Sequence, residues 1–316
     1  MDLDWCSNLT KFPKISRNVK KLYLRGTAVE EIPSLRHLTS LEALFLDGCS
    51  NITKFPQISG AITELHLSGT VIDEVPNSAI KSLNKLVELD LRYNTRLKNL
   101  PTSMIHLTSL ERLHLDGCSN ITKFPQIPGT ITHLSLKETA IEEVPDSAIK
   151  FLNITKFLIK LDLSVNTRLK NLPTSLIHLT SLETLNLSGC SNITKFPQIS
   201  GAITLLFMGG TAIDDVPNSA IESLYKLDYL DISGNTRLKN LPSMSHLTSL
   251  RSLCLSGCSN ITEFPKISVE ITNLYLSGTA IEEIPSFVER FTNLEYLAFD
   301  HCRSLKRVSS GIFKLK

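Results

Sequence analysis

Three residues in the chain have the side chains of a serine hydrolase and fall at equivalent places in a repeated pattern. Asp90, His114 and Ser135 each end a triplet with a central leucine: ELD, RLH and HLS. If these triplets are adjacent parallel strands, about 4.8 Å apart, the three side chains lie side by side. The surroundings lack the strained turn and the paired backbone amides that acyl transfer requires. We therefore interpret these residues as a polar row on a solvated sheet and expect no catalytic residues.

The histidine and cysteine residues are the candidate metal ligands of the sequence. His114 and His133 fall on neighbouring strands but two positions apart, roughly 7–8 Å, whereas zinc requires three or four converging ligands. Six of the seven cysteines recur at one place in a repeated pattern. Cys254 lies outside that pattern and has no basic neighbour on its own strand to lower its pKa. The sequence therefore predicts neither a metal site nor a cofactor.

The repeated pattern explains most of the chain. The segment DGCSNITKFPQIS at 47–59 returns with few changes at 116–128, 188–200 and 256–268. A catalytic motif is needed once, so four copies indicate architecture. The motif L-x-x-L-x-L-x-x-N/C recurs throughout, as in LTSLEALFLDGC (38–49) and LTSLERLHLDGC (107–118). It predicts an α/β leucine-rich repeat solenoid, a horseshoe with a parallel β-sheet on its concave face. We expect mostly irregular or extended returns on the convex side, with little helix.

The spacing of the copies predicts one repeat domain over residues 1–316. Counting triplets gives about 14 rungs, where a rung is one strand with its return segment. Cys49, Cys118, Cys190 and Cys258 are 69, 72 and 68 residues apart, which indicates a super-repeat of three rungs and about 69 residues. The longest interval contains extra residues in FLNITKFLIKL (151–161), where we expect a bulged loop on the outer side.

A small side chain able to donate a hydrogen bond stands where the chain turns after each strand. Buried carbonyl groups at such turns need donors. We therefore predict a buried structural ladder, which makes its cysteines neither ligands nor nucleophiles. Its members are Cys6, Thr27, Cys49, Thr70, Asn94, Cys118, Thr139, Asn166, Cys190, Thr211, Asn235, Cys258, Thr279 and Cys302.

Large apolar residues at strand positions that face solvent are the strongest functional signal. Exposed aromatic side chains on a concave surface are typical of protein-binding hot spots. The alternative is that aromatic residues favour strands and pack across them. The predicted partner-binding residues on the concave face are Tyr23, Phe45, Leu205, Phe207, Tyr229, Tyr275 and Tyr296.

Charge and targeting signals narrow the functional classes. The net charge is +2, from 33 basic and 31 acidic residues, which favours neither nucleic acid nor a membrane as partner. The N-terminal segment lacks the basic start and apolar stretch of a signal peptide. Glycosylation sequons such as those at Asn51, Asn120 and Asn153 would matter only in the secretory pathway. We expect a protein of the cytoplasm or the nucleus.

The segment LDGCSNITKFPQISGAITELHLSGTVIDEVPNSAI (46–80) resembles the repeat region of plant intracellular disease resistance proteins. These receptors carry a Toll/interleukin-receptor (TIR) domain and a nucleotide-binding domain ahead of the repeats, and the resemblance covers nearly all of 1–316. Neither a nucleotide-binding P-loop nor a TIR-like segment occurs in the sequence, so we expect a fragment or a repeat-only paralogue. The resemblance implies an effector-sensing and autoinhibitory region. Its partners would be a pathogen effector or guarded host protein, and the nucleotide-binding domain of a full-length receptor.

Together these observations predict a non-enzymatic protein-recognition module of plant innate immunity. Three alternatives stay open at this point. The chain could be an extracellular leucine-rich repeat receptor ectodomain, which would use the sequons. It could be an adaptor or substrate receptor in ubiquitin ligation, or an enzyme that uses the row of Asp90, His114 and Ser135.

Overall fold

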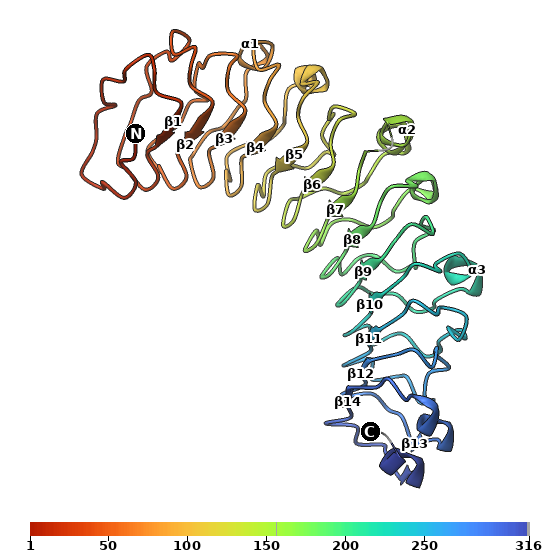
Figure 1. The fold of residues 1–316 in the computed structure, drawn as a ribbon. Coiled ribbons are helices and arrows are strands. Elements are labelled where there is room, and N and C mark those ends of the chain that lie inside the picture. Colours follow the sequence, from red (N-terminus) through yellow and green to blue (C-terminus); the bar gives the residue numbers. More distant parts are fainter. Residues whose placement is uncertain (156, 315–316) are drawn as a thin grey trace. The chain divides into compact units, whose positions relative to one another are not determined.

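The computed structural model describes residues 1–155 and 157–314. The chain divides into two compact units, Met1–Leu161 and Asp162–Lys316. Each unit is a stack of rungs with a short strand on one side and a longer return segment on the other (Figure 1). Both units are built from the same repeat, and the leucine-rich repeat solenoid predicted from the sequence is confirmed. The single domain over 1–316 stays a prediction.

Three-residue parallel strands pair in sequence order in the first unit. The middle leucine of each triplet is buried, as Leu22, Leu44 and Leu65 show with no exposed surface. Burying one such side chain stabilises the fold by about 1.5–3 kcal/mol. The strands are β1 (Lys21–Tyr23), β2 (Ala43–Phe45), β3 (Glu64–His66), β4 (Glu88–Asp90), β5 (Arg112–His114) and β6 (His133–Ser135), and β7 (Lys160–Asp162) lies where the two units divide.

The second unit repeats this arrangement. Its strands are β8 (Thr184–Asn186), β9 (Leu205–Phe207), β10 (Tyr229–Asp231), β11 (Ser252–Cys254), β12 (Asn273–Tyr275) and β14 (Tyr296–Ala298). A second sheet of two strands, β13 (Glu283–Ile284) and β15 (Arg307–Val308), also forms in this unit. There the Nε of Arg307 donates a 2.9 Å hydrogen bond to Oε2 of Glu283.

The return segments contain little helix, as expected. Several of these short helices begin directly after a proline. An example is Pro76 before α1, with φ −69° and ψ 139°, where the fixed φ of proline sets an extended entry into the first turn of the helix. The α-helices are α1 (Asn77–Ile80), α2 (Asp146–Thr155) and α3 (Asn218–Ile221). The 3-10 helices are η1 (Thr102–His106), η2 (Thr174–His178), η3 (Ser286–Arg290) and η4 (Ser310–Lys314).

The bulged loop expected at 151–161 is wrong for the first part of that segment. Helix α2 has ten residues, whereas α1 and α3 have four each. Ile149 and Leu152, three positions apart on one helix face, are both buried, and this spacing anchors a helix rather than a loop. Lys156 and the side chain of the sequon residue Asn153 lie outside the described residues.

The residue before each ladder position adopts a left-handed backbone conformation. Glycine holds it in most rungs, for example Gly48 with φ +73° and Gly117 with φ +69°, because a side chain is strained there. Tyr93 takes the same conformation at φ +59°. Its ring covers Gly117, where an added Cβ would lie 2.5 Å from Cδ1 of Tyr93.

Of the helices in the described chain, none is both long and apolar enough to cross a membrane.

Candidate functional site

The ladder cysteines join neighbouring rungs through their thiols. Sγ of Cys118 donates to the carbonyl of Leu91 at 3.1 Å, and Sγ of Cys190 donates to the carbonyl of Leu163 at 3.0 Å. In both pairs the acceptor belongs to the preceding rung. Burial raises the pKa of Cys118 to about 12 and that of Cys190 to about 11. These thiols therefore stay protonated near neutral pH, which suits a hydrogen-bond donor rather than a nucleophile.

The ladder asparagines bridge two rungs at once. Nδ2 of Asn94 donates to the carbonyls of Leu67 at 2.8 Å and Leu91 at 2.9 Å. Its Oδ1 accepts from Oγ1 of Thr70 at 2.6 Å and from the amide of Ile72 at 3.2 Å. The buried side-chain amide of Asn94 therefore forms hydrogen bonds with four main-chain or side-chain groups. Asn235 repeats this arrangement in the second unit, and Asn166 donates to the carbonyl of Leu163.

Two of the predicted ladder cysteines depart from full burial. Cys6 is exposed, so the expectation that it is buried is wrong. The other ladder thiols donate to a carbonyl of the preceding rung, and Cys6 stands in the first rung of the chain. Cys302 is half-buried, and its Sγ donates to the carbonyl of Leu276 at 3.1 Å.

The row of Asp90, His114 and Ser135 is in register across β4, β5 and β6. The side chains nevertheless have other partners. Nη2 of Arg92 donates to Oδ2 of Asp90 at 2.6 Å, and the hydroxyl of Ser135 donates to Oδ1 of Asp116. Asp90 is buried, with 1% of its surface exposed, which corrects its placement on a solvated row. The described chain shows no hydrogen bond among the three, and burial lowers the pKa of His114.

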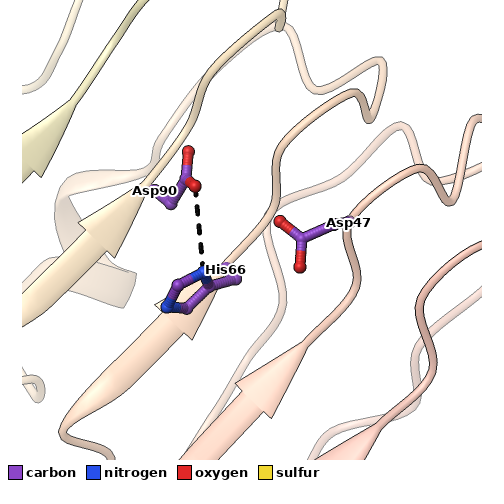
Figure 2. Close-up of side chains that lie close together, drawn as sticks. All are labelled: Asp47, His66 and Asp90. Carbon is purple, nitrogen blue, oxygen red and sulfur yellow. Dashed lines mark ion pairs between the residues drawn. The ribbon is translucent and has the colours of Figure 1, made fainter. Parts of the chain in front are cut away.

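A cluster that the sequence reasoning missed lies beside this row. Asp47, which follows β2, His66 on β3 and Asp90 on β4 each offer one ligand atom within 4.8 Å of the others (Figure 2). Nδ1 of His66 lies 3.8 Å from Oδ2 of Asp90. Burial raises the pKa of Asp47, against the nearby charges of His66 and Arg25. The only signal in the sequence is a diagonal of Asp, His and Asp over three consecutive rungs.

Two carboxylates and an imidazole can in principle ligate a divalent cation. Here an arginine already neutralises Asp90, and a second arginine lies near Asp47. Nε of Arg92 lies 3.0 Å from Oδ1 and 2.9 Å from Oδ2 of Asp90, and Nε of Arg25 lies 4.0 Å from Oδ2 of Asp47. A metal ion would have to displace the bidentate guanidinium, so we interpret this cluster as an ion-pair network.

The aromatic pair of the first unit is covered by an arginine. The rings of Tyr23 and Phe45 stack with centroids 4.7 Å apart and an interplanar angle of 3°. The guanidinium carbon of Arg25 lies 5.3 Å from the Tyr23 centroid and 4.9 Å from the Phe45 centroid. Nε of the same arginine lies 3.2 Å from Oδ2 of Asp4. These half-buried rings therefore already hold a cation from their own chain.

The second unit gathers the other five predicted residues on its sheet. The ring centroids of Phe207 and Tyr229 are 5.1 Å apart, and those of Tyr275 and Tyr296 are 5.0 Å apart. Leu205 is in register with Tyr229. Tyr296 is 51% exposed, and the other four are half-buried. The side chains therefore form two ring pairs that flank β11, and their role in partner binding stays a prediction.

Comparisons with known proteins agree with this architecture. A leucine rich repeat family model matches residues 61–119, and a second one matches residues 181–202. Among solved structures, a leucine-rich repeat protein of Leptospira interrogans is 22% identical with a TM-score of 0.73, covering 98% of this chain and 83% of its own. The functional domain of InlJ from Listeria monocytogenes, which includes a cysteine ladder, is 23% identical with a TM-score of 0.70, covering 89% and 58%. The chain belongs to the leucine-rich repeat proteins.

The curated relatives are disease resistance proteins and related proteins of Arabidopsis thaliana. Protein SUPPRESSOR OF npr1-1, CONSTITUTIVE 1 is 40% identical over 324 residues, which cover 96% of this chain and 19% of that protein. Disease resistance protein RPS6 is 35% identical over 212 residues, 67% of this chain and 16% of that protein. The chain thus spans less than a fifth of the length of these relatives. Its repeats are related to those of plant disease resistance proteins, which implies protein recognition.

Proposed function

We propose that this chain is a non-enzymatic recognition module of plant immunity that binds a protein partner on its sheet face. The partner is a pathogen effector or a guarded host protein, or the nucleotide-binding domain of a full-length receptor. The module acts in the cytoplasm or the nucleus. Its role is effector sensing and autoinhibition, as in the intracellular receptors that its repeats resemble.

One observation carries this proposal: the two ring pairs of the second unit face outward from the sheet. Tyr296 has 51% of its surface exposed in the described chain. Partly exposed aromatic side chains supply large contact area at low cost in conformational entropy. Relatedness to disease resistance proteins supports a protein as the bound molecule.

Site-specific photo-cross-linking tests the proposal. A photoreactive phenylalanine replaces Tyr296 on the sheet, or Tyr225 in the return segment that leads into β10, and each protein is irradiated in plant leaf extract. Both tyrosines are exposed, at 51% and 62%, so the two positions are matched for accessibility. We expect a discrete cross-linked protein from position 296 that disappears in the Phe207→Ala and Tyr275→Ala double variant. Cross-links from position 225 alone would contradict the proposal.

A further inference from the structure

The first unit shows how a positively charged side chain sits on this type of sheet. Arg25 lies over the rings of Tyr23 and Phe45, at 5.3 Å and 4.9 Å from their centroids. Its Nε lies 3.2 Å from Oδ2 of Asp4 and 4.0 Å from Oδ2 of Asp47. Two ring faces and two carboxylates thus lie close enough to attract the guanidinium.

The second unit has the rings and the carboxylate, but it has no arginine at the position equivalent to Arg25 beside them. Asp231 on β10 is in register between Phe207 on β9 and Cys254 on β11, and Tyr229 lies two residues earlier on its own strand. Arg25 stands two residues after Tyr23, which ends β1. The equivalent positions after β8 to β12 carry only small neutral residues: Ser188, Gly209, Ser233, Ser256 and Ser277.

In the part of the chain that the structure describes, the carboxylate of Asp231 lacks a cationic partner. Its Oδ1 accepts a 2.9 Å hydrogen bond from the amide of Ser233. No lysine or arginine within residues 1–155 and 157–314 forms an ion pair with it. Arg251, which precedes β11, instead donates to the carbonyls of Thr248 at 2.8 Å and Glu270 at 3.3 Å. In the first unit, by contrast, Asp90 is paired with Arg92.

We propose that a partner protein inserts an arginine side chain at Asp231, against the rings of Phe207 and Tyr229. This inference rests on the proposed function, because it specifies what the partner presents to the sheet. Asp231 is half-buried, so its attraction for a cation is stronger than in bulk water. Burial and then the nearby charge of Asp231 raise the pKa of Tyr229.

Arginine fits these neighbours better than lysine does. A guanidinium is planar, stacks on aromatic faces and donates two parallel hydrogen bonds to a carboxylate, whereas an ammonium is a strongly hydrated point charge. Gly209 keeps the carboxylate accessible. A Cβ added there would lie 2.8 Å from Oγ of Ser233 and 2.9 Å from Oδ2 of Asp231, so a serine, as in neighbouring rungs, would crowd the carboxylate that receives the guanidinium.

An NMR titration of the full chain with labelled tyrosine rings tests the proposal. The probes are an acetylated, amidated Gly-Gly-Arg-Gly-Gly peptide and its counterparts with citrulline, which has a similar shape but no charge, or with lysine. The Tyr229→Phe variant assigns the Tyr229 signal. We expect saturable shifts of that signal with the arginine peptide, and affinity lower by about fivefold or more with citrulline or lysine.

Two variants test separately how the charge of Asp231 and the space around its carboxylate affect binding of the arginine peptide. Asp231→Asn should weaken the arginine peptide by about fivefold or more, consistent with loss of one partly buried ion pair. Asp228→Asn, which removes an exposed carboxylate just before β10, should leave the affinity unchanged. Gly209→Ser retains the carboxylate and should still weaken binding, so the test does not depend on Asp231→Asn being stably folded.

Equal binding of the arginine and citrulline peptides, or unchanged affinity in both Asp231→Asn and Gly209→Ser, would overturn the inference. Binding of lysine as tightly as arginine would also overturn it. Cross-linking from position 296 distinguishes this failure from failure of the proposed function. A partner that still cross-links there while the arginine peptide does not bind leaves the proposed function standing.

Discussion

The Sγ atom of Cys118 donates a 3.1 Å hydrogen bond to the main-chain carbonyl of Leu91 in the preceding rung. Cys49, Cys190 and Cys258 make the same bond to Leu24, Leu163 and Ile232. A thiol is small enough for the buried turn and supplies a further donor to a carbonyl that also accepts a hydrogen bond from Nδ2 of Asn94. This relationship explains why a small side chain that can donate a hydrogen bond stands at this place in the repeat.

The buried thiols predict a loss of stability in alkali. The pKa of Cys118 and of Cys258 is about 12 in the fold, against an ordinary value of 9.0. Between these values the unfolded chain has released thiol protons that the folded chain retains. The free energy of unfolding should therefore fall as the pH rises, by up to about 1.4 kcal/mol per pH unit for each thiol.

Urea unfolding at a series of pH values measures this slope. Replacing Cys118 by alanine removes one titrating thiol, so the variant should lose stability less steeply with pH than the wild type. Its stability at neutral pH should be lower by about 0.5–1.5 kcal/mol, the net contribution of a hydrogen bond. An identical pH dependence in the two proteins would show that Cys118 is not buried as a neutral donor.

The left-handed glycines predict a second, graded effect. Gly48→Ala and Gly117→Ala each place a side chain at a positive φ, which costs about 1–2 kcal/mol. At Gly117 the new Cβ would also lie 2.5 Å from Cδ1 of Tyr93, whereas at Gly48 it would meet only Gly26 atoms at 3.8 Å. Thermal unfolding should therefore show the larger loss for Gly117→Ala.

Replacing Tyr93 by glycine should relieve that clash. In the double variant with Gly117→Ala, the loss should shrink to that of Gly48→Ala, because only the backbone strain at position 117 remains. The single Tyr93→Gly variant provides the baseline. Equal losses for the two alanine variants, or no recovery in the double variant, would refute the close approach of the ring to Gly117.

Zinc should distinguish an ion-pair network from a metal site at Asp47, His66 and Asp90. Arg92 contacts both carboxylate oxygens of Asp90, so excess zinc should leave the wild-type melting temperature unchanged. Arg92→Ala frees those oxygens, and zinc should then raise its melting temperature, since a ligand that binds only the folded state stabilises it. Stabilisation of the wild type by zinc would contradict the ion-pair interpretation.

The strand positions could be predicted because two periodicities coincide. Alternation within a strand buries Leu22 and leaves Tyr23 outward, and the repeat length places Tyr23 opposite Phe45 in the next rung. Neither fact depends on distant parts of the chain. The repeat also predicted that Cys118 stands at a turn whose buried carbonyl groups accept hydrogen bonds.

Other features depend on contacts that no local pattern contains. Asp90 can be buried because Arg92, two residues after it, forms an ion pair with its carboxylate. Tyr93 holds a left-handed conformation that a sequence rule would reserve for glycine. Helix α2 is longer than α1 and α3 because its additional residues include Leu152, whose side chain is buried. Each outcome is decided by packing between rungs.

The central claim is that inward leucines hold the stack together while outward aromatic side chains are free to bind. Leu187, which has no exposed surface, should lose about 2–5 kcal/mol of unfolding free energy when replaced by alanine. The Phe207→Ala and Tyr275→Ala double variant should melt within a few degrees of the wild type and lose the cross-link from position 296. A large loss of stability in the double variant, with a neutral Leu187→Ala, would contradict the assignment of the two faces.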